Sequence, residues 1–235
     1  MKTLQTIIFL LFFSSIFGQT KTFHNIVSSK GDTTYWYSYH CHILKKLSLI
    51  PLETSAQKEY FRVWTNKQAI DIWQNQSGTF SGTITNWTAE CVPEKEKETN
   101  RVYVLTKPLN ADTATLIRQL YISSGILNLP TEDSIKDWQQ GLDGVMYFIE
   151  HSTTDNYSFK SYWTPQAQGK LIEAIQVQNF IDNAFKLANA QTVWKLFSKQ
   201  IPYECYMNGG PSVTMKILTK KEKKKYAKER KNYCQ

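Results

Sequence analysis

The fold class is clearest from residues 60–91, which read YFRVWTNKQAIDIWQNQSGTFSGTITNWTAEC. Three runs rich in aromatic and β-branched residues, 61–64, 70–73 and 79–91, are separated by polar turns at 65–67 and 75–78. Runs of this length and spacing predict antiparallel strands. Beyond a charged loop at 93–100, residues 101–105 predict a fourth strand, so we expect an antiparallel meander.

If the first two of these strands pair in register, their apolar side chains lie on one face of the sheet and their polar and indole side chains on the other. This follows because alternate residues of a strand point to opposite faces. The apolar set would face the core: Phe61, Val63, Ile70 and Ile72. The other face would carry two indoles, a cation and a carboxylate: Arg62, Trp64, Asp71 and Trp73. Such a face is a candidate ligand-binding surface, on which a sugar ring stacks and its hydroxyls are hydrogen-bonded. The alternative is an ordinary cross-strand ladder of a cation over an indole and an ion pair.

Helical spacing of apolar residues appears on both sides of a second predicted hairpin. Residues 111–127 and the segment from residue 166 to 185 predict amphipathic helices, and 192–197 predicts a third, short helix. Residues 145–150 and 157–163 predict the hairpin between them, and 212–218 a last strand. The predicted class is α+β: an antiparallel meander sheet packed against two or three helices on one face, with a basic C-terminal tail.

Residues 33–42, TTYWYSYHCH, are rich in aromatic residues and threonine, which favours a strand. In a strand His40 and His42 point the same way, an arrangement that suits a zinc or copper ion. A third ligand would have to come from elsewhere in the chain. The alternative interpretation is a pair of surface or cross-strand histidines, with no cofactor.

The N-terminus has the pattern of a secretory signal: Lys2, an apolar run over residues 7–13, and Gly18 before the expected cleavage site. The run is too short to span a bilayer, and we expect no membrane span after cleavage. We therefore expect an exported protein, periplasmic or secreted. The expected division is a signal peptide at 1–18, a single α+β domain at 19–218 and a basic tail at 219–235.

The net charge of +8 is concentrated near the C-terminus. Nine basic and two acidic residues lie between Lys216 and Lys231, and the body of the mature chain is neutral. A nucleic-acid-binding domain would carry its basic patch on the fold, so we expect no nucleic-acid partner. The tail suits an anionic surface or polymer. The alternative is a solvated tail that serves solubility.

Four cysteines, an even number in an expected exported chain, predict disulfides: Cys41, Cys91, Cys205 and Cys234. Three connectivities are possible, and the sequence does not choose among them. The absence of a C-x-x-C pair argues against a thioredoxin-like motif and against a zinc ribbon.

The sequence contains no nucleophile elbow, H-E-x-x-H motif, phosphate-binding loop or dinucleotide fingerprint. Our first hypothesis is a non-enzymatic exported module that acts by binding or in the cell envelope. The alternative is an exported hydrolase or metal-dependent enzyme without a local signature. Its best candidate residues are His40, His42 and His151.

Overall fold

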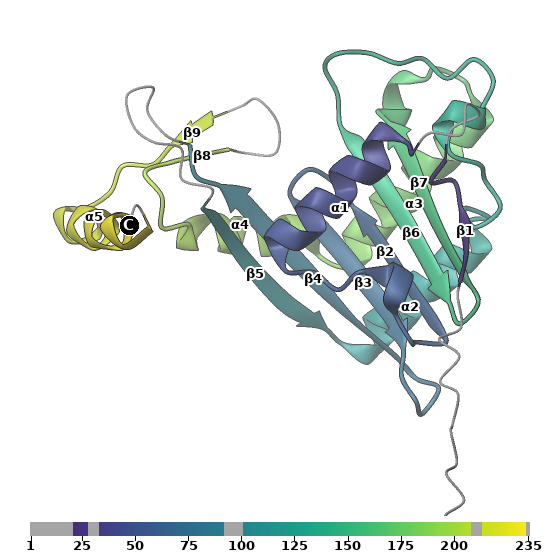
Figure 1. Ribbon diagram of the computed structural model, residues 1–235, viewed down its shortest axis with the longest axis horizontal. Coiled ribbons are helices and arrows are strands. Elements are labelled where there is room, and N and C mark those ends of the chain that lie inside the picture. Colours follow the sequence, from purple (N-terminus) through teal and green to yellow (C-terminus); the bar gives the residue numbers. More distant parts are fainter. Residues whose placement is uncertain (1–20, 28–32, 92–100, 208–212, 234–235) are drawn as a thin grey trace, which may run out of the picture.

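A mixed seven-stranded sheet forms the centre of the molecule (Figure 1). The computed structural model describes residues 21–27, 33–91, 101–207 and 213–233, and the predicted signal segment lies outside them. The strand order across the sheet is β1-β7-β6-β2-β3-β4-β5. These strands are β1 (Thr22–His24), β2 (Glu59–Trp64), β3 (Gln68–Gln74), β4 (Phe80–Ala89), β5 (Val102–Leu109), β6 (Met146–Thr153) and β7 (Asn156–Trp163). With the helices described below, they confirm the α+β class.

The sheet is largely antiparallel, but it is not a pure meander. Strands β2 to β5 are consecutive antiparallel neighbours, and β2 pairs with β3 in the predicted register, with Arg62 opposite Asp71. The β6–β7 hairpin then joins the sheet beside β2, and β1 pairs in parallel with β7. Sequence periodicity predicts strands but not their neighbours, because an edge strand offers the same unpaired backbone groups to any later segment.

Three helices cover one face of the sheet, here called the back face (Figure 1). They are α2 (Ala111–Ser123), α3 (Ile172–Leu187) and α4 (Ala190–Gln200), close to the three segments predicted from helical spacing. The side chain of Asn110 caps α2 by accepting a hydrogen bond from the backbone N–H of Thr113 at 2.7 Å. The Phe61 ring stacks on Tyr121 of α2 at 4.3 Å between ring centroids. The predicted core face of β2 and β3 is therefore the back face.

The other face, the front face, is covered by helix α1 (Tyr35–Leu47), so the strand predicted over residues 33–42 is wrong. The expectation of helices on one face only is wrong for the same reason. Thr34 caps the helix by accepting a hydrogen bond from the Tyr37 N–H, and Ser48 ends it in the left-handed conformation. The buried residues His40, Leu44 and Leu47 share one helix face. Burial of this stripe against the sheet outweighs the local β preference of aromatic residues, which depends strongly on context.

The C-terminal part forms an arm at the β4–β5 end of the sheet (Figure 1). The arm consists of the hairpin β8 (Cys205–Met207) and β9 (Val213–Met215) and the helix α5 (Lys220–Tyr233). A disulfide between Cys91 and Cys205 joins β8 to the end of β4. In the described ranges, no helix is both long and apolar enough to cross a bilayer.

Candidate functional site

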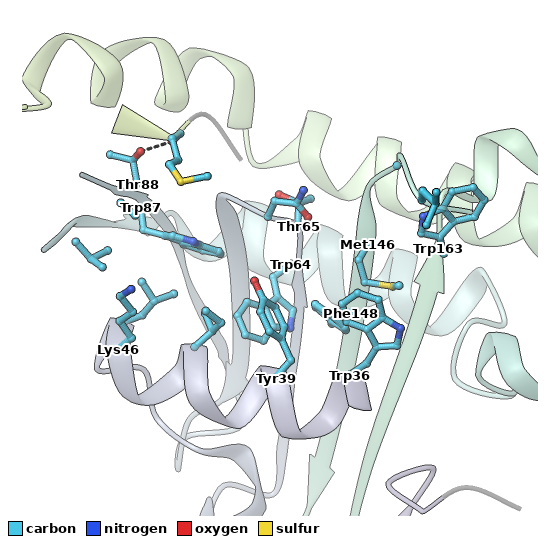
Figure 2. A pocket seen from close by; sticks show the side chains of 18 of the residues that line it. Trp36, Tyr39, Lys46, Trp64, Thr65, Trp87, Thr88, Met146, Phe148 and Trp163 are labelled. Carbon is cyan, nitrogen blue, oxygen red and sulfur yellow. Dashed lines mark hydrogen bonds between the residues drawn. The ribbon is translucent and has the colours of Figure 1, made fainter. Parts of the chain in front are cut away.

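A cavity of about 490 Å³ lies on the front face, between α1 and the sheet (Figure 2). Helix α1 provides one wall, and strands β2, β4, β6 and β7 provide the opposite wall. Six aromatic side chains line it: Trp36, Tyr39, Trp64, Trp87, Phe148 and Trp163. The volume is in the range of small-molecule sites, which are concave and mostly apolar.

The aromatic side chains of the wall support one another. Trp64 lies edge-on to Trp87 at 5.9 Å and is tilted against Phe148 at 5.5 Å between ring centroids. From α1, the ring of Trp36 contacts Phe148 at 5.9 Å and is perpendicular to Tyr39 at the same separation. Edge-to-face pairs at these distances are favourable, so the wall is held by contacts among its own residues.

One end of the cavity is closed by the loop at residues 140–144, in which two glycines lie against Trp163. A Cβ added to Gly141 would stand 2.3 Å from the Trp163 ring, and one added to Gly144 would stand 2.6 Å from its indole nitrogen. The loop therefore requires glycine at both positions to approach the indole this closely. Leu142, between them, is fully exposed at the cavity rim.

Most of the lining is apolar, and the non-aromatic polar side chains among the described lining residues are those of Lys46, Thr65, Asn66, Thr88 and Gln140. Lys46 of α1 carries the only charge among the lining residues that the structure describes, and its side chain is exposed. The indole N–H of Trp64 is buried and has no hydrogen-bond partner within the described part of the chain. An unpaired buried donor costs about 1–3 kcal/mol. Lys46 is therefore the charged group that a bound molecule would meet at the rim.

A buried ionic network lies next to the cavity, under α1, and consists of His40, Arg62, Asp71 and Glu150. Arg62 Nε lies 2.6 Å from Asp71 Oδ1, and its Nη1 lies 3.4 Å from Glu150 Oε2. The other oxygen of Glu150 lies 3.0 Å from His40 Nε2. Burial alone would raise the pKa of Glu150, but His40 and Arg62 together bring it below its ordinary value. The contact between His40 and Glu150 therefore joins α1 to β6, and Arg62 joins β2 to β3 and β6.

Trp64 separates this network from the cavity. The His40 ring meets the Trp64 indole edge-on at 4.4 Å between centroids, and none of the four network residues lines the cavity. Tyr60 and Tyr157 add hydrogen bonds of 3.0 Å to Asp71 and Glu150. The carboxylates of the network are thus paired with Arg62, His40 and the two tyrosines, and none of these groups lines the cavity.

The four residues of the predicted sheet face reach three different environments. Arg62 and Asp71 are buried in the ionic network, because α1 covers this face. Trp64 lines the cavity. Trp73 is half-buried beside Tyr60, at 5.7 Å between ring centroids, and is not a lining residue. The structure thus brings only Trp64 of this set to the cavity, and the premise of an open sheet face is wrong.

The three candidate histidines are dispersed. On a helix, residues two apart differ by about 200° in direction, so His40 and His42 do not share a face and the premise of that pair is wrong. His40 is buried against Glu150, and His42 is exposed. His151 points to the back face, where its ring lies 5.6 Å from that of Tyr121. The described residues hold no group of three or more His, Cys, Asp or Glu side chains placed to bind a metal ion.

Two of the four cysteines form a disulfide. Cys91 and Cys205 are bonded, with 5.1 Å between their Cα atoms. Cys41 of α1 is a free, half-buried thiol. Cys234 lies outside the described residues.

Sequence reasoning missed most of the cavity. The α1 residues Trp36, Tyr39 and Ile43 are spaced at three and four, which is a helical signal hidden by the aromatic content of the segment. Trp87 and Trp163 lie in predicted strands, but the sequence does not show that both reach the same cavity. Their strands, β4 and β7, are separated by three other strands of the sheet. No family model matches the chain, and no similarity to a curated protein or to a solved structure is found.

Proposed function

We propose that the chain is a non-catalytic binding module for a small amphipathic molecule with an apolar body and one anionic group. The observation that carries the proposal is a cavity of about 490 Å³ whose described lining includes six aromatic side chains and one charged residue, Lys46. Concave, mostly apolar walls with a few polar groups are typical of sites that bind small molecules.

The lining suggests how such a ligand is held. Its apolar body would lie between α1 and the indoles of Trp64 and Trp87, where it loses contact with water. Its anionic group would face Lys46 at the rim.

Binding is favoured over catalysis because the reactive groups near the cavity are already engaged. An active site needs acid, base or nucleophile side chains that converge on a reacting atom. His40 and Glu150 face each other under α1, behind Trp64. His42 and His151, the other residues of the enzyme hypothesis, point elsewhere. These positions therefore support neither a hydrolase nor a metal-dependent enzyme built on the three histidines.

We further propose that this binding takes place outside the cytoplasm, in the periplasm or beyond the cell. The signal-like segment at residues 1–18 supports export. The Cys91–Cys205 disulfide supports an oxidising compartment, because such bonds persist there and are rare in the cytosol.

The test is a fluorescence titration with anilinonaphthalene sulfonate, a probe that combines aromatic rings with one anionic group. We expect saturable binding at one site per chain. Lys46→Glu should weaken it roughly tenfold, because an exposed ion pair contributes up to about 1 kcal/mol and the reversed charge adds repulsion. Leu142→Glu should weaken it similarly by placing a carboxylate at the rim.

Two matched variants keep this test specific. Lys45→Glu makes the same change at an exposed neighbour on α1 that does not line the cavity. Ile172→Glu makes the same change as Leu142→Glu at an exposed position on α3. Both should bind the probe like the wild type. Equal losses in test and control variants, or no saturable binding, would refute the proposed function.

A further inference from the structure

The arm exposes three apolar side chains, two in strand β9 and one just after it, which together are called the apolar strip. Val213, Met215 and Ile217 alternate along the chain and are 53%, 68% and 97% exposed. Lys216, between them, points back to the body, where its Nζ donates to the carbonyl oxygen of Ile201 at 2.9 Å. Single exposed apolar residues are ordinary, but here two come from β9 and a third follows two residues later, so exposed apolar side chains gather on the arm.

Helix α5 follows this strip directly and presents a basic stripe. At 3.6 residues per turn, four lysines fall within a sector of about 100°. All four are exposed, and none has an acidic partner within the described part of the chain: Lys220, Lys221, Lys224 and Lys228. The stripe is thus uncompensated positive charge.

The opposite side of α5 faces the body. Tyr226 donates a hydrogen bond to Glu90, and Arg101 lies 5.7 Å from the Tyr226 ring centre. Lys223, at the edge, pairs with Glu204 at 3.1 Å. The N–H of Thr219 donates to Glu222, and the Thr219 hydroxyl accepts from the Glu222 N–H, which is a capping box. The helix is therefore held in one orientation, with its basic stripe away from the body.

We propose that the arm is a peripheral docking surface for a bilayer that contains anionic lipid. The lysines of α5 meet the headgroups, and the strip Val213, Met215 and Ile217 enters the interfacial region. Basic residues supply attraction to anionic lipid, and apolar side chains next to them supply insertion. A soluble acidic polymer would satisfy the lysines but leave the apolar strip in water, so the two features together favour a membrane. This inference does not rest on the proposed ligand cavity.

The test is co-sedimentation of the chain lacking residues 1–18 with lipid vesicles. We expect binding to vesicles that contain phosphatidylglycerol and little binding to phosphatidylcholine alone. The triple variant Lys221→Gln, Lys224→Gln and Lys228→Gln should weaken binding roughly fivefold for each lysine removed near the surface. Met215→Glu with Ile217→Glu should reduce binding at least tenfold with all lysines kept.

Matched variants on the back face make the result specific. Lys186→Gln, Lys195→Gln and Lys199→Gln remove the same charge from exposed positions of α3 and α4, and Ile172→Glu changes an exposed apolar residue there. These variants should bind vesicles like the wild type, and circular dichroism should show every variant folded. Equal binding to both vesicle types, equal loss in the control variants, or lysine-dependent retention on heparin without vesicle binding would overturn the proposal.

Discussion

The two faces of the sheet share the same strands but are covered differently. On the back face, Phe61, Val63, Ile70 and Ile72 are fully buried by three helices in a closed apolar core. On the front face, the alternate residues of the same strands meet a single helix, α1, and a cavity of about 490 Å³ remains. The back face is thus a closed apolar core, whereas the incompletely covered front face leaves the space in which we propose that a ligand binds.

The largest expected effect comes from breaking the front-face ionic network. Arg62→Met would leave Asp71 and Glu150 buried without their shared cation, and should lower the free energy of unfolding by about 3–5 kcal/mol. Arg118, which pairs with Glu59 at 3.1 Å and is one-third exposed, offers the matched control. Arg118→Met should cost no more than about 1 kcal/mol. Urea unfolding measures both, and equal costs would contradict a buried network.

The next largest loss of stability is expected when a core side chain is shortened on the back face. Ile72→Ala removes a fully buried side chain from the core and should cost about 2–5 kcal/mol by urea unfolding. Binding of anilinonaphthalene sulfonate should stay at the wild-type level under conditions where the variant is folded. A loss of probe affinity as large as that of Leu142→Glu would show that the two faces are not independent.

A smaller expected effect is a pH dependence of the free energy of unfolding that comes from Glu150. Because the pKa of Glu150 is lowered from 4.5, the contribution of its ionised form to stability is present above that pH and is lost as the pH falls through the lower folded value. The stability difference between wild type and Glu150→Gln should therefore narrow below about pH 4.5. Unfolding measured at a series of pH values checks this. A difference that is constant with pH, or that widens in acid, would contradict the assigned sign.

The back face was largely predictable from the sequence, for a physical reason. Alternation in residues 61–64 and 70–73 separates apolar from polar side chains, and the turn between them fixes the register, so the buried set follows from local pattern. The helices α2 and α3 were predictable because their apolar residues recur at helical spacing.

The front face was not predictable in the same way. Residues 35–47 contain both β-favouring aromatics and a helical stripe, and only contact with the sheet decides between the two. His40 then meets Glu150, 110 positions away in the sequence, and Trp36 meets Phe148. Such pairings depend on strand order, which local sequence does not encode. Trp64 is nevertheless a residue of the predicted ligand-binding face that does line the cavity.

The most direct test of the ligand cavity follows the indole N–H signals of the seven tryptophans by NMR during titration with anilinonaphthalene sulfonate. Four indoles line the cavity, and three do not: Trp73, Trp138 and Trp194. Substitution of each tryptophan by phenylalanine assigns the signals. We expect saturable shifts for Trp36, Trp64, Trp87 and Trp163. Shifts confined to the other three, or spread equally over all seven, would contradict it.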